Sequence, residues 1–331
     1  MSAIDPSVYE IFSIKSANGS KTVDLRAGVI SFSYFEDVFS PMVTATVLIS
    51  STGGVMKDED GDSVSMYNGL PLRGGERVSI KIPSNSDKNI DLEFTEENDR
   101  ELFVASITNV LISAESESFT LNLVSREAIS NETSRVGKKF PSSEPISDSV
   151  KEIIEKYLLS KKEVIVDETM NPYGFYGNMK KPFTILTWLA SKSVPGNSSG
   201  QSSSAGYFFY ETKDGYNFRS VDTLVTQEPF AEKYTYSPGV VDNLDPRKDF
   251  KILQYSVSRN QNLIHNLERG AYCTYRMYLN PVTFRFTTVE QGLFKTSDYA
   301  DKMENLGESF EVELAPVDDT GKTLADIPSR F

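Results

Sequence analysis

The segment spanning residues 181–224 constrains the fold most, because it places a helical pattern directly before a strand hairpin. Pro182 is favoured in a first helical turn, and apolar residues recur at helical spacing after it, which predicts an amphipathic helix over 182–193. A Ser/Gly/Asn-rich loop follows, and two aromatic-rich runs then flank Asp214-Gly215, a dipeptide typical of a tight turn. A helix followed by a hairpin indicates an α+β region.

The first part of the chain predicts an antiparallel β-domain over residues 1–140. Apolar and polar residues alternate with the period of a strand at 29–36 and at 42–50. Further strands are predicted at 78–82, 102–110 and 119–125. Several strands with no clear helix favour a small barrel or sandwich.

The pattern changes after Pro141, and a middle α+β domain is expected over 141–248. Apolar residues at helical spacing predict an amphipathic helix over 146–159, and a short strand follows at 163–167. Strands are predicted again at 250–259, 271–278 and 283–288, as the start of a second β-domain over 249–331 with an acidic tail. The fold class is therefore α+β and β-dominated.

Composition excludes several classes of function. The formal net charge is −13, which argues against a surface that grips nucleic acid phosphates. Cys273 is the single cysteine and His265 the single histidine, so an internal disulfide and a zinc or haem site are not expected. No run approaches the roughly 20 apolar residues of a membrane span, and the start lacks a signal-peptide pattern. We expect folding and assembly in the cytoplasm.

The order of these elements resembles the central baseplate hub proteins of contractile-tailed, T-even-type bacteriophages. The resemblance is carried by Phe119-Thr-Leu-Asn-Leu-Val-Ser-Arg126, which runs through Asn131 and Arg135-Val-Gly-Lys-Lys-Phe140 into the helix at 146. The helix and aromatic hairpin of 181–224 and the return to strands at 250–278 continue it. It spans most of residues 8–290 and rests on element order and aromatic texture.

The resemblance implies an architecture and a set of partners. Two tail-tube-like barrels would flank the middle domain, and three subunits would form a pseudo-sixfold ring that adapts the sixfold tail tube to a threefold spike. The implied partners are a spike protein below, a tail tube or tube-initiator protein above and baseplate wedge proteins around. DNA would pass through the lumen without specific binding, in a virion tail baseplate without catalytic residues, cofactor or metal. The chain departs from the family at its C-terminus, where the second barrel is either abbreviated or completed by other chains.

Ring closure requires exposed strand edges or apolar faces that pair between subunits. Phe35, Phe39 and Met42 lie between two predicted strands and are candidates for that interface. The alternative is that the three side chains fill the barrel core or its cap. Phe39→Asp is expected to weaken assembly while leaving the monomer folded, and a variant that unfolds would favour the alternative.

Enzymatic interpretations rest on acidic residues. Glu96 with Glu97, or Asp318 with Asp319, could be imagined as a glycosidase pair, but adjacent strand residues point to opposite faces and acidic pairs in loops are usually solvated. Residues 58–62 partly match a calcium loop, yet Gly69 stands where the twelfth-position Glu belongs.

Three single residues have structural interpretations. Trp188 is expected to pack in a core or between domains rather than stack on a sugar. His265 is expected to make a structural hydrogen bond, and Cys273 to be a small buried hydrophobe.

Two other functions stay open from sequence. A carbohydrate-binding or glycan-degrading accessory module of a virion would also be β-rich and aromatic, and it predicts one concave aromatic cleft with convergent carboxylates. The hub of a secretion or contractile-injection machine would share the tube-like barrel, since fold does not settle function.

Overall fold

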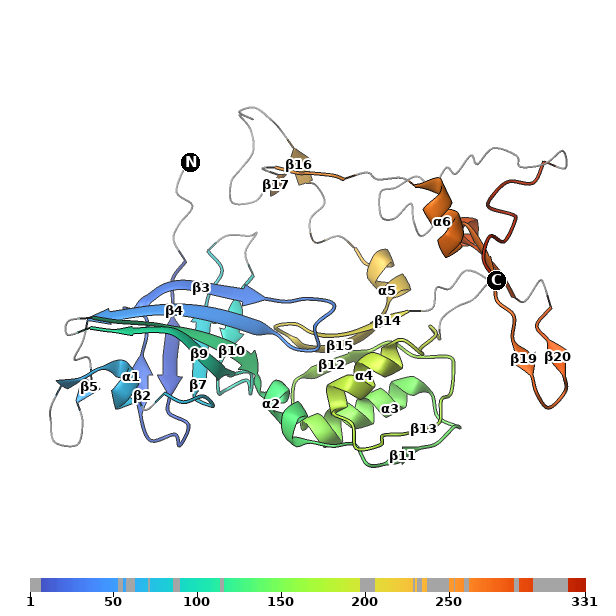
Figure 1. Ribbon diagram of the computed structural model, residues 1–331. Helices are drawn as coiled ribbons and strands as arrows, with labels where there is room; N and C mark the ends of the chain where they lie inside the picture. The colour runs from blue at the N-terminus through green and yellow to red at the C-terminus, as the bar shows by residue number, and fades with distance from the viewer. Residues whose placement is uncertain are drawn as a thin grey trace.

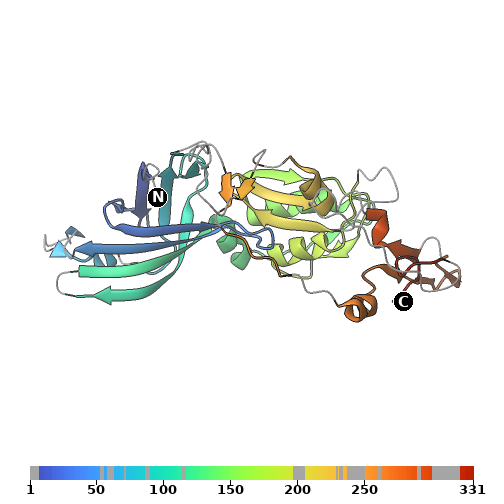
Figure 2. The same cartoon turned by 90° about the horizontal axis from the view of Figure 1, so that it is seen from above.

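The computed structural model describes residues 7–331, apart from 53–55, 58–62, 71, 86–89, 114–115, 197–205, 229, 231–233, 237–249, 253, 259–261, 289–291 and 300–320. Two hydrophobic cores organise the described residues, one within 12–123 and the other within 136–218. The cores lie side by side, and helix α2 (Arg126–Thr133) lies where they meet (Figures 1 and 2). No helix among the described residues is both long and apolar enough to cross a membrane.

The first core is enclosed by a curled antiparallel sheet. Its strands run in the order β2-β1-β7-β9-β10-β4-β3, and β8 pairs with β7. The strands are β1 Ile11–Lys15, β2 Thr22–Asp24, β3 Val29–Phe35, β4 Thr44–Thr52, β7 Arg77–Ile82, β8 Leu92–Phe94, β9 Leu102–Ile112 and β10 Ser116–Ser125. The strands predicted from alternation are confirmed. The sheet curls like half a barrel, and its end strands β2 and β3 do not pair with each other among the described residues (Figure 2).

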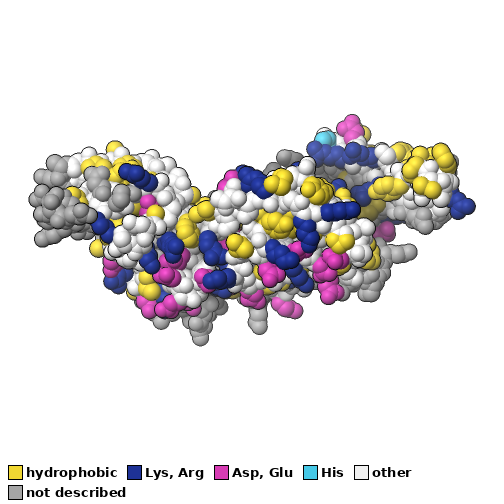
Figure 3. Space-filling model, turned by 90° about the horizontal axis from the view of Figure 1, so that it is seen from below, with side chains coloured by type: hydrophobic (Ala, Val, Ile, Leu, Met, Phe, Trp, Pro, Cys, Tyr) yellow, Lys and Arg dark blue, Asp and Glu magenta, His cyan; other side chains and the backbone are white. Residues whose placement is uncertain are grey.

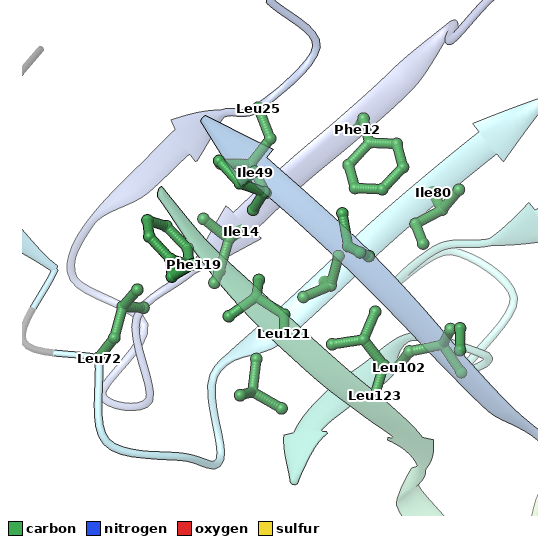
Figure 4. Packing of buried hydrophobic residues seen from close by; sticks show 14 of the residues in the cluster. Phe12, Ile14, Leu25, Ile49, Leu72, Ile80, Leu102, Phe119, Leu121 and Leu123 are labelled. Carbon is green, nitrogen blue, oxygen red and sulfur yellow. The ribbon is translucent and has the colours of Figure 1, made fainter. Parts of the chain in front are cut away.

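The alternation in sequence becomes two faces of this sheet. Ala45, Val47 and Ile49 of β4 are buried, whereas the intervening residues lie on the other face. Figure 4 shows Phe12 and Ile80 from β1 and β7 beside Ile49 and Phe119 from β4 and β10. Burying each such side chain contributes about 1.5–3 kcal/mol. The excursion from β4 to β7 contains β5 Met56–Lys57, β6 Ser63–Val64 and the single helical turn α1 Met66–Gly69.

The second core lies between two helices and a mixed three-stranded sheet. The sheet has the order β12-β15-β14, with β12 parallel to β15 and β14 antiparallel to it. Its elements are α3 Ile146–Ile153, the π-helical turn η1 Ile154–Leu158, β12 Glu163–Val166, α4 Pro182–Ala190, β14 Tyr207–Glu211, β15 Gly215–Ser220 and α5 Val221–Thr226. A small ladder of β11 Lys139–Phe140 and β13 Phe175–Tyr176 lies outside the helices (Figure 1).

Two features of this core follow from local sequence. The helix predicted at 146–159 is confirmed as α3 with η1, and the helix after Lys181 is confirmed but ends at Ala190 rather than at 193. Gly215 opens β15 with φ 151°, and an added Cβ there would lie 2.1 Å from the Glu163 carbonyl oxygen. The parallel pairing of β12 with β15 therefore requires glycine at this position.

The C-terminal part follows the prediction least. Its described elements are β16 Tyr234–Tyr236, β17 Phe250–Ile252, α6 Leu263–Arg269, β18 Cys273–Tyr275, β19 Leu279–Asn280, β20 Arg285–Phe286, β21 Leu293–Lys295 and the 3₁₀ turn η2 Thr296–Tyr299. The long strand predicted at 250–259 was wrong beyond Ile252, since residues 254–258 are exposed and outside any strand. Helix α6 was not predicted.

These short strands pair only in twos among the described residues. Cys273 is buried as expected, and it is the one hydrophobic side chain described after residue 249 that is fully buried. Apolar and polar residues alternate at 250–259, but no hydrophobic core lies against residues 254–258, so this part of the segment does not form a strand. The structure is thus a β-dominated α+β fold with a curled sheet. The domain boundaries at 140 and 248 and the second tube-like barrel stay predictions.

Candidate interaction surfaces

Four adjacent strands, β9-β10-β4-β3, form a sheet face without charged side chains. Across these four strands Glu117 is the one charged residue, and it is buried. Its carboxylate accepts hydrogen bonds from the backbone N–H of Met66 at 2.6 Å and of Tyr67 at 3.2 Å. Glu117 therefore fixes the turn α1 on the core side and contributes nothing to the outer face.

The outer face carries mostly short polar residues, with Leu48 of β4 among them. One row crosses all four strands, because Ser33 pairs with Thr46, Thr46 with Asn122, and Asn122 with Ser106. The Asn122 amide donates to the hydroxyl oxygens of Ser106 at 3.0 Å and Thr108 at 3.3 Å. We call this surface the uncharged face. It can hydrogen-bond to water or to a partner, and it has no cation with which to hold a phosphate.

The edges of the uncharged face are open. Strand β3 ends the sheet and, within the described part of the chain, pairs with β4 alone. Strand β9 pairs with β7 only at Leu102 and Phe103, so its remaining length pairs with β10 alone among the described strands. The tip of β9 also exposes Leu111 at 71% and Ile112 at 51%. Unpaired edges of this kind favour association with another strand.

The three interface candidates predicted from sequence lie at one end of this face. Phe35, the last residue of β3, is 54% exposed, and Phe39 is 77% exposed. The Phe39 ring meets Phe208 of β14 edge-to-face at 5.3 Å. Met42 is half-buried and packs against the second core. None of the three belongs to the first core, so filling that core does not explain them. Their role in an interface stays a prediction.

A buried ion cluster joins the two cores. The Lys162 ammonium lies 2.7 Å from a Glu127 carboxylate oxygen and 2.5 Å from a Glu211 carboxylate oxygen. The other Glu211 oxygen accepts from the backbone N–H of Val43 at 2.9 Å and the Ser125 hydroxyl at 2.7 Å. Val43 immediately precedes β4 and Ser125 ends β10 of the first sheet, whereas Glu211 ends β14. This cluster therefore fixes the first sheet to the second core.

Two carboxylates share the Lys162 ammonium, and the Arg126 guanidinium lies 3.9 Å from the Glu127 carboxylate as a second cation. Both carboxylates are fully buried and the Lys162 side chain is 5% exposed. Burial raises the pKa of Glu211, and the neighbouring Glu127 carboxylate adds to the rise against the opposing effect of Lys162. In the low dielectric of the interior, each buried charge loses its hydration, and only the opposite charge beside it compensates for that cost.

The sequence interpretation missed this cluster, although one signal was present. Glu211 shares the strand face of Tyr207 and Phe209, so alternation placed it in the core. A carboxylate on the buried face of a strand requires a buried cation or hydrogen-bond donors. Lys162, by contrast, carries no local signal in a loop between two elements.

The remaining sequence candidates do not converge on one site. Glu96 forms an exposed ion pair with Lys15 at 3.1 Å, and Asp318 and Asp319 lie outside the described residues, as does the 58–62 segment. His265 is exposed on α6, where its backbone N–H bonds the Asn262 side chain; a structural role of its ring stays a prediction. No group of three His, Cys, Asp or Glu side chains within the described ranges is arranged to hold a metal ion.

No family model matches the chain, and no curated protein matches it. Two solved structures that it is similar to are described as tail proteins. The 43 kDa tail protein of prophage MuSo2 from Shewanella oneidensis is 10% identical over 63% of this chain and 54% of that protein, with a TM-score of 0.40. A tail protein from Neisseria meningitidis is 14% identical over 70% of this chain and 56% of that protein, with a TM-score of 0.41.

A third similar structure is the E. coli c3393 protein, described as a component of the type VI secretion system with structural similarity to the T4 tail proteins gp27 and gp5. It is 10% identical over 70% of this chain and 50% of that protein, with a TM-score of 0.35. The chain thus spans about half the length of the structures that it matches. At these identities and TM-scores a function must rest on the surfaces of the protein itself.

Proposed function

We propose that this protein is a structural subunit of a phage tail, the trimeric central hub of a baseplate, and that the uncharged face lines its DNA channel. The uncharged face is the observation that carries the proposal. About a quarter of the chain is charged, yet four long adjacent strands place no charge on one whole surface. A channel for a polyanion needs such a surface, since cations would hold phosphates and fixed anions would repel them.

The open edges of β3 and β9 support a ring. Joining an edge strand of one copy to a neighbouring copy would extend the sheet and carry the uncharged face around the lumen. The ring would adapt the sixfold tail tube above to a threefold spike below, with wedge proteins around it. The second tube-like barrel that makes such a ring pseudo-sixfold belongs to this proposal. A contractile-injection machine would use the same surfaces.

Asn122→Arg tests the role of the uncharged face. The purified wild-type protein should retain no duplex DNA at low salt, whereas the arginine variant should retain it in a salt-dependent manner. Asn122→Asp is the matched control, because it loses the same amide and adds the opposite charge. Loss of assembly in both variants, with folding intact, would contradict the lumen assignment and indicate a protein interface instead. DNA retention by the wild-type protein would also contradict it.

The carbohydrate alternative predicts a concave aromatic cleft with convergent carboxylates. An aromatic pocket is present beside Trp188, but no acidic residue lines it. The pocket therefore fits a different role.

A further inference from the structure

An open aromatic pocket lies on the outer side of α4. Its volume is about 170 Å³, and Phe175, Tyr176 and Trp188 line it together with Asn178, Lys180 and Thr184. That volume is below the roughly 300–1,000 Å³ of pockets for drug-sized ligands. A single side chain of another protein is the size of occupant that it fits.

The aromatic wall of the pocket is held rigidly. Trp188 is 39% exposed, and its ring lies edge-on to Tyr173 at 5.5 Å and to Phe175 at 5.6 Å. Phe175 in turn stacks on the buried Phe140 at 4.4 Å. The sequence interpretation of Trp188 as a packing residue holds for one edge of the ring. Its remaining surface is available to a ligand.

The rim of the pocket carries backbone strain and a free cation. Asn178 and the adjacent Met179 have φ of 49° and 55°, a left-handed conformation that non-glycine residues rarely adopt. Within the described residues the Lys180 ammonium has no carboxylate partner, whereas neighbouring Lys181 pairs with Glu132. Figure 3 views the molecule from below, and hydrophobic side chains are interspersed there with both basic and acidic side chains. The pocket suits an aromatic or aliphatic side chain that is next to a carboxylate.

The connection from β3 to β4 of the same chain has that chemistry. Phe35 and Phe39 are largely exposed and flank Glu36 and Asp37. Neither acid pairs with a lysine or arginine in the part of the chain that the structure describes. The connection is ordered, because Asp37 accepts from the Phe39 backbone N–H at 2.8 Å and Glu36 from the Lys213 backbone N–H at 2.6 Å.

One copy cannot fill its own pocket with this connection. Phe39 contacts Phe208, on the face of β14 away from the helices, whereas the adjacent Phe209 lies 6.0 Å from Phe183 of α4. The pocket lies beyond α4, so the connection and the pocket are on opposite sides of the second core (Figure 1). A contact between them joins two copies head to tail, which is the geometry of rings.

We propose that the pocket receives the β3–β4 connection of a neighbouring copy, with a phenylalanine ring against Trp188 and the Asp37 carboxylate against Lys180. This inference rests on the proposed ring and adds a second contact between neighbouring copies to the strand-edge pairing. The β3–β4 connection that enters the pocket includes the interface candidates Phe35 and Phe39. Exposed aromatic residues facing a Trp pocket are the usual centre of a protein interface.

Trp188 is the single tryptophan of the chain, so its fluorescence reports on this pocket alone. In a dilution series of the full chain, the mass should fall to that of a monomer as Trp188 becomes more accessible to acrylamide and its emission moves to longer wavelength. An oligomer whose Trp188 is quenched as readily as that of the monomer would overturn the docking contact and leave the ring intact. A chain that stays monomeric at every concentration would overturn both.

Charge exchange tests the pairing itself. Lys180→Glu and Asp37→Lys should each weaken self-association about tenfold or more, and the double variant should recover most of the loss, because each interface regains an opposite pair. Asp37→Asn is the control for the local turn, since its side-chain oxygen can still accept from the Phe39 N–H. Circular dichroism confirms folding in each variant. Full association of both single variants would contradict the proposal.

A cross-link gives the most direct geometric readout. Asp37→Cys and Lys180→Cys are each made in a Cys273→Ala background and should form no disulfide alone, yet join when the two proteins are mixed under oxidising conditions. Absence of the mixed disulfide in a mixture that contains oligomers would overturn the contact. Protection of Trp188 by neutral oligosaccharides in the monomer, without protection on self-association, would also overturn it and assign the pocket to sugars.

Discussion

The two cores differ in where they place charge. Residues 1–125 hold 9 basic and 19 acidic residues, yet the outer surface of the β9-β10-β4-β3 sheet is free of them. Residues 126–227 hold 13 basic and 12 acidic residues, and there a lysine and two glutamates enter the interior. The first region places its charges in loops, in strands outside this four-stranded face and at the buried Glu117, which leaves one face neutral. The second uses buried charge to fix the joint between the cores.

Lys162→Ala should have the largest effect on this joint. It leaves the buried Glu211 carboxylate without its cation and Glu127 with the Arg126 guanidinium at 3.9 Å, and breaking a buried pair costs about 3–5 kcal/mol of unfolding free energy. The matched control is the adjacent Lys161→Ala, whose exposed pair with Asp99 at 2.9 Å contributes about 0–1 kcal/mol. Urea unfolding measures both. Equal losses in the two variants would contradict the role of the buried cluster.

The pH dependence of stability sharpens the same point. Burial raises the pKa of Glu211 above its ordinary 4.5, so the folded state binds this proton more tightly than the unfolded state does. The stability that this group contributes is complete below pH 4.5 and is lost as pH rises through the folded-state pKa. The wild-type protein should therefore lose stability as pH rises from 4.5, whereas the Glu211→Gln variant has no carboxyl to titrate. The difference in unfolding free energy between wild type and variant should become smaller over this range. If the difference in unfolding free energy instead became larger with rising pH, the pKa of Glu211 would be lowered in the folded state rather than raised.

Asn122→Ala tests the construction of the uncharged face. It removes the hydrogen bonds to Ser106 and Thr108. A hydrogen bond contributes about 0.5–1.5 kcal/mol to the unfolding free energy, and a partly exposed one lies at the low end of that range. We expect a loss of about 1 kcal/mol in thermal or urea unfolding, with no change in DNA retention. A gain of DNA binding would mean that the amide itself excludes phosphates.

Phe39→Asp should have the smallest effect on stability and a clear effect on assembly. The ring is 77% exposed and touches only Phe208 as an aromatic partner among the described residues, so its loss should cost below about 1 kcal/mol. The mass of the Phe39→Asp protein in solution should nevertheless fall toward that of the monomer. Phe284→Asp, at a ring that is 79% exposed in the C-terminal part, is the matched control and should leave assembly unchanged.

Alternation predicted the first sheet well, because each of its strands has one buried face and one exposed face. The same pattern failed at 254–258, where no core lies beneath it and the residues are exposed. Helical spacing found α3 and α4, since each packs one stripe of apolar side chains. Single-residue reasoning gave Phe35, Phe39 and Met42 as interface candidates, of which the first two are exposed and Met42 is half-buried. The Lys162 cluster and the Trp188 pocket depend on residues far apart in sequence and required the tertiary structure.

The mass of the purified protein in solution tests the central claim most directly. Light scattering over a dilution series should give an assembly of three times 37.0 kDa at high concentration, since the proposed ring contains three copies. The trimer should dissociate on dilution and lose stability when Phe39 is replaced. A persistent monomer at every concentration, with the fold intact by circular dichroism, would contradict the hub and the copy-to-copy contact together.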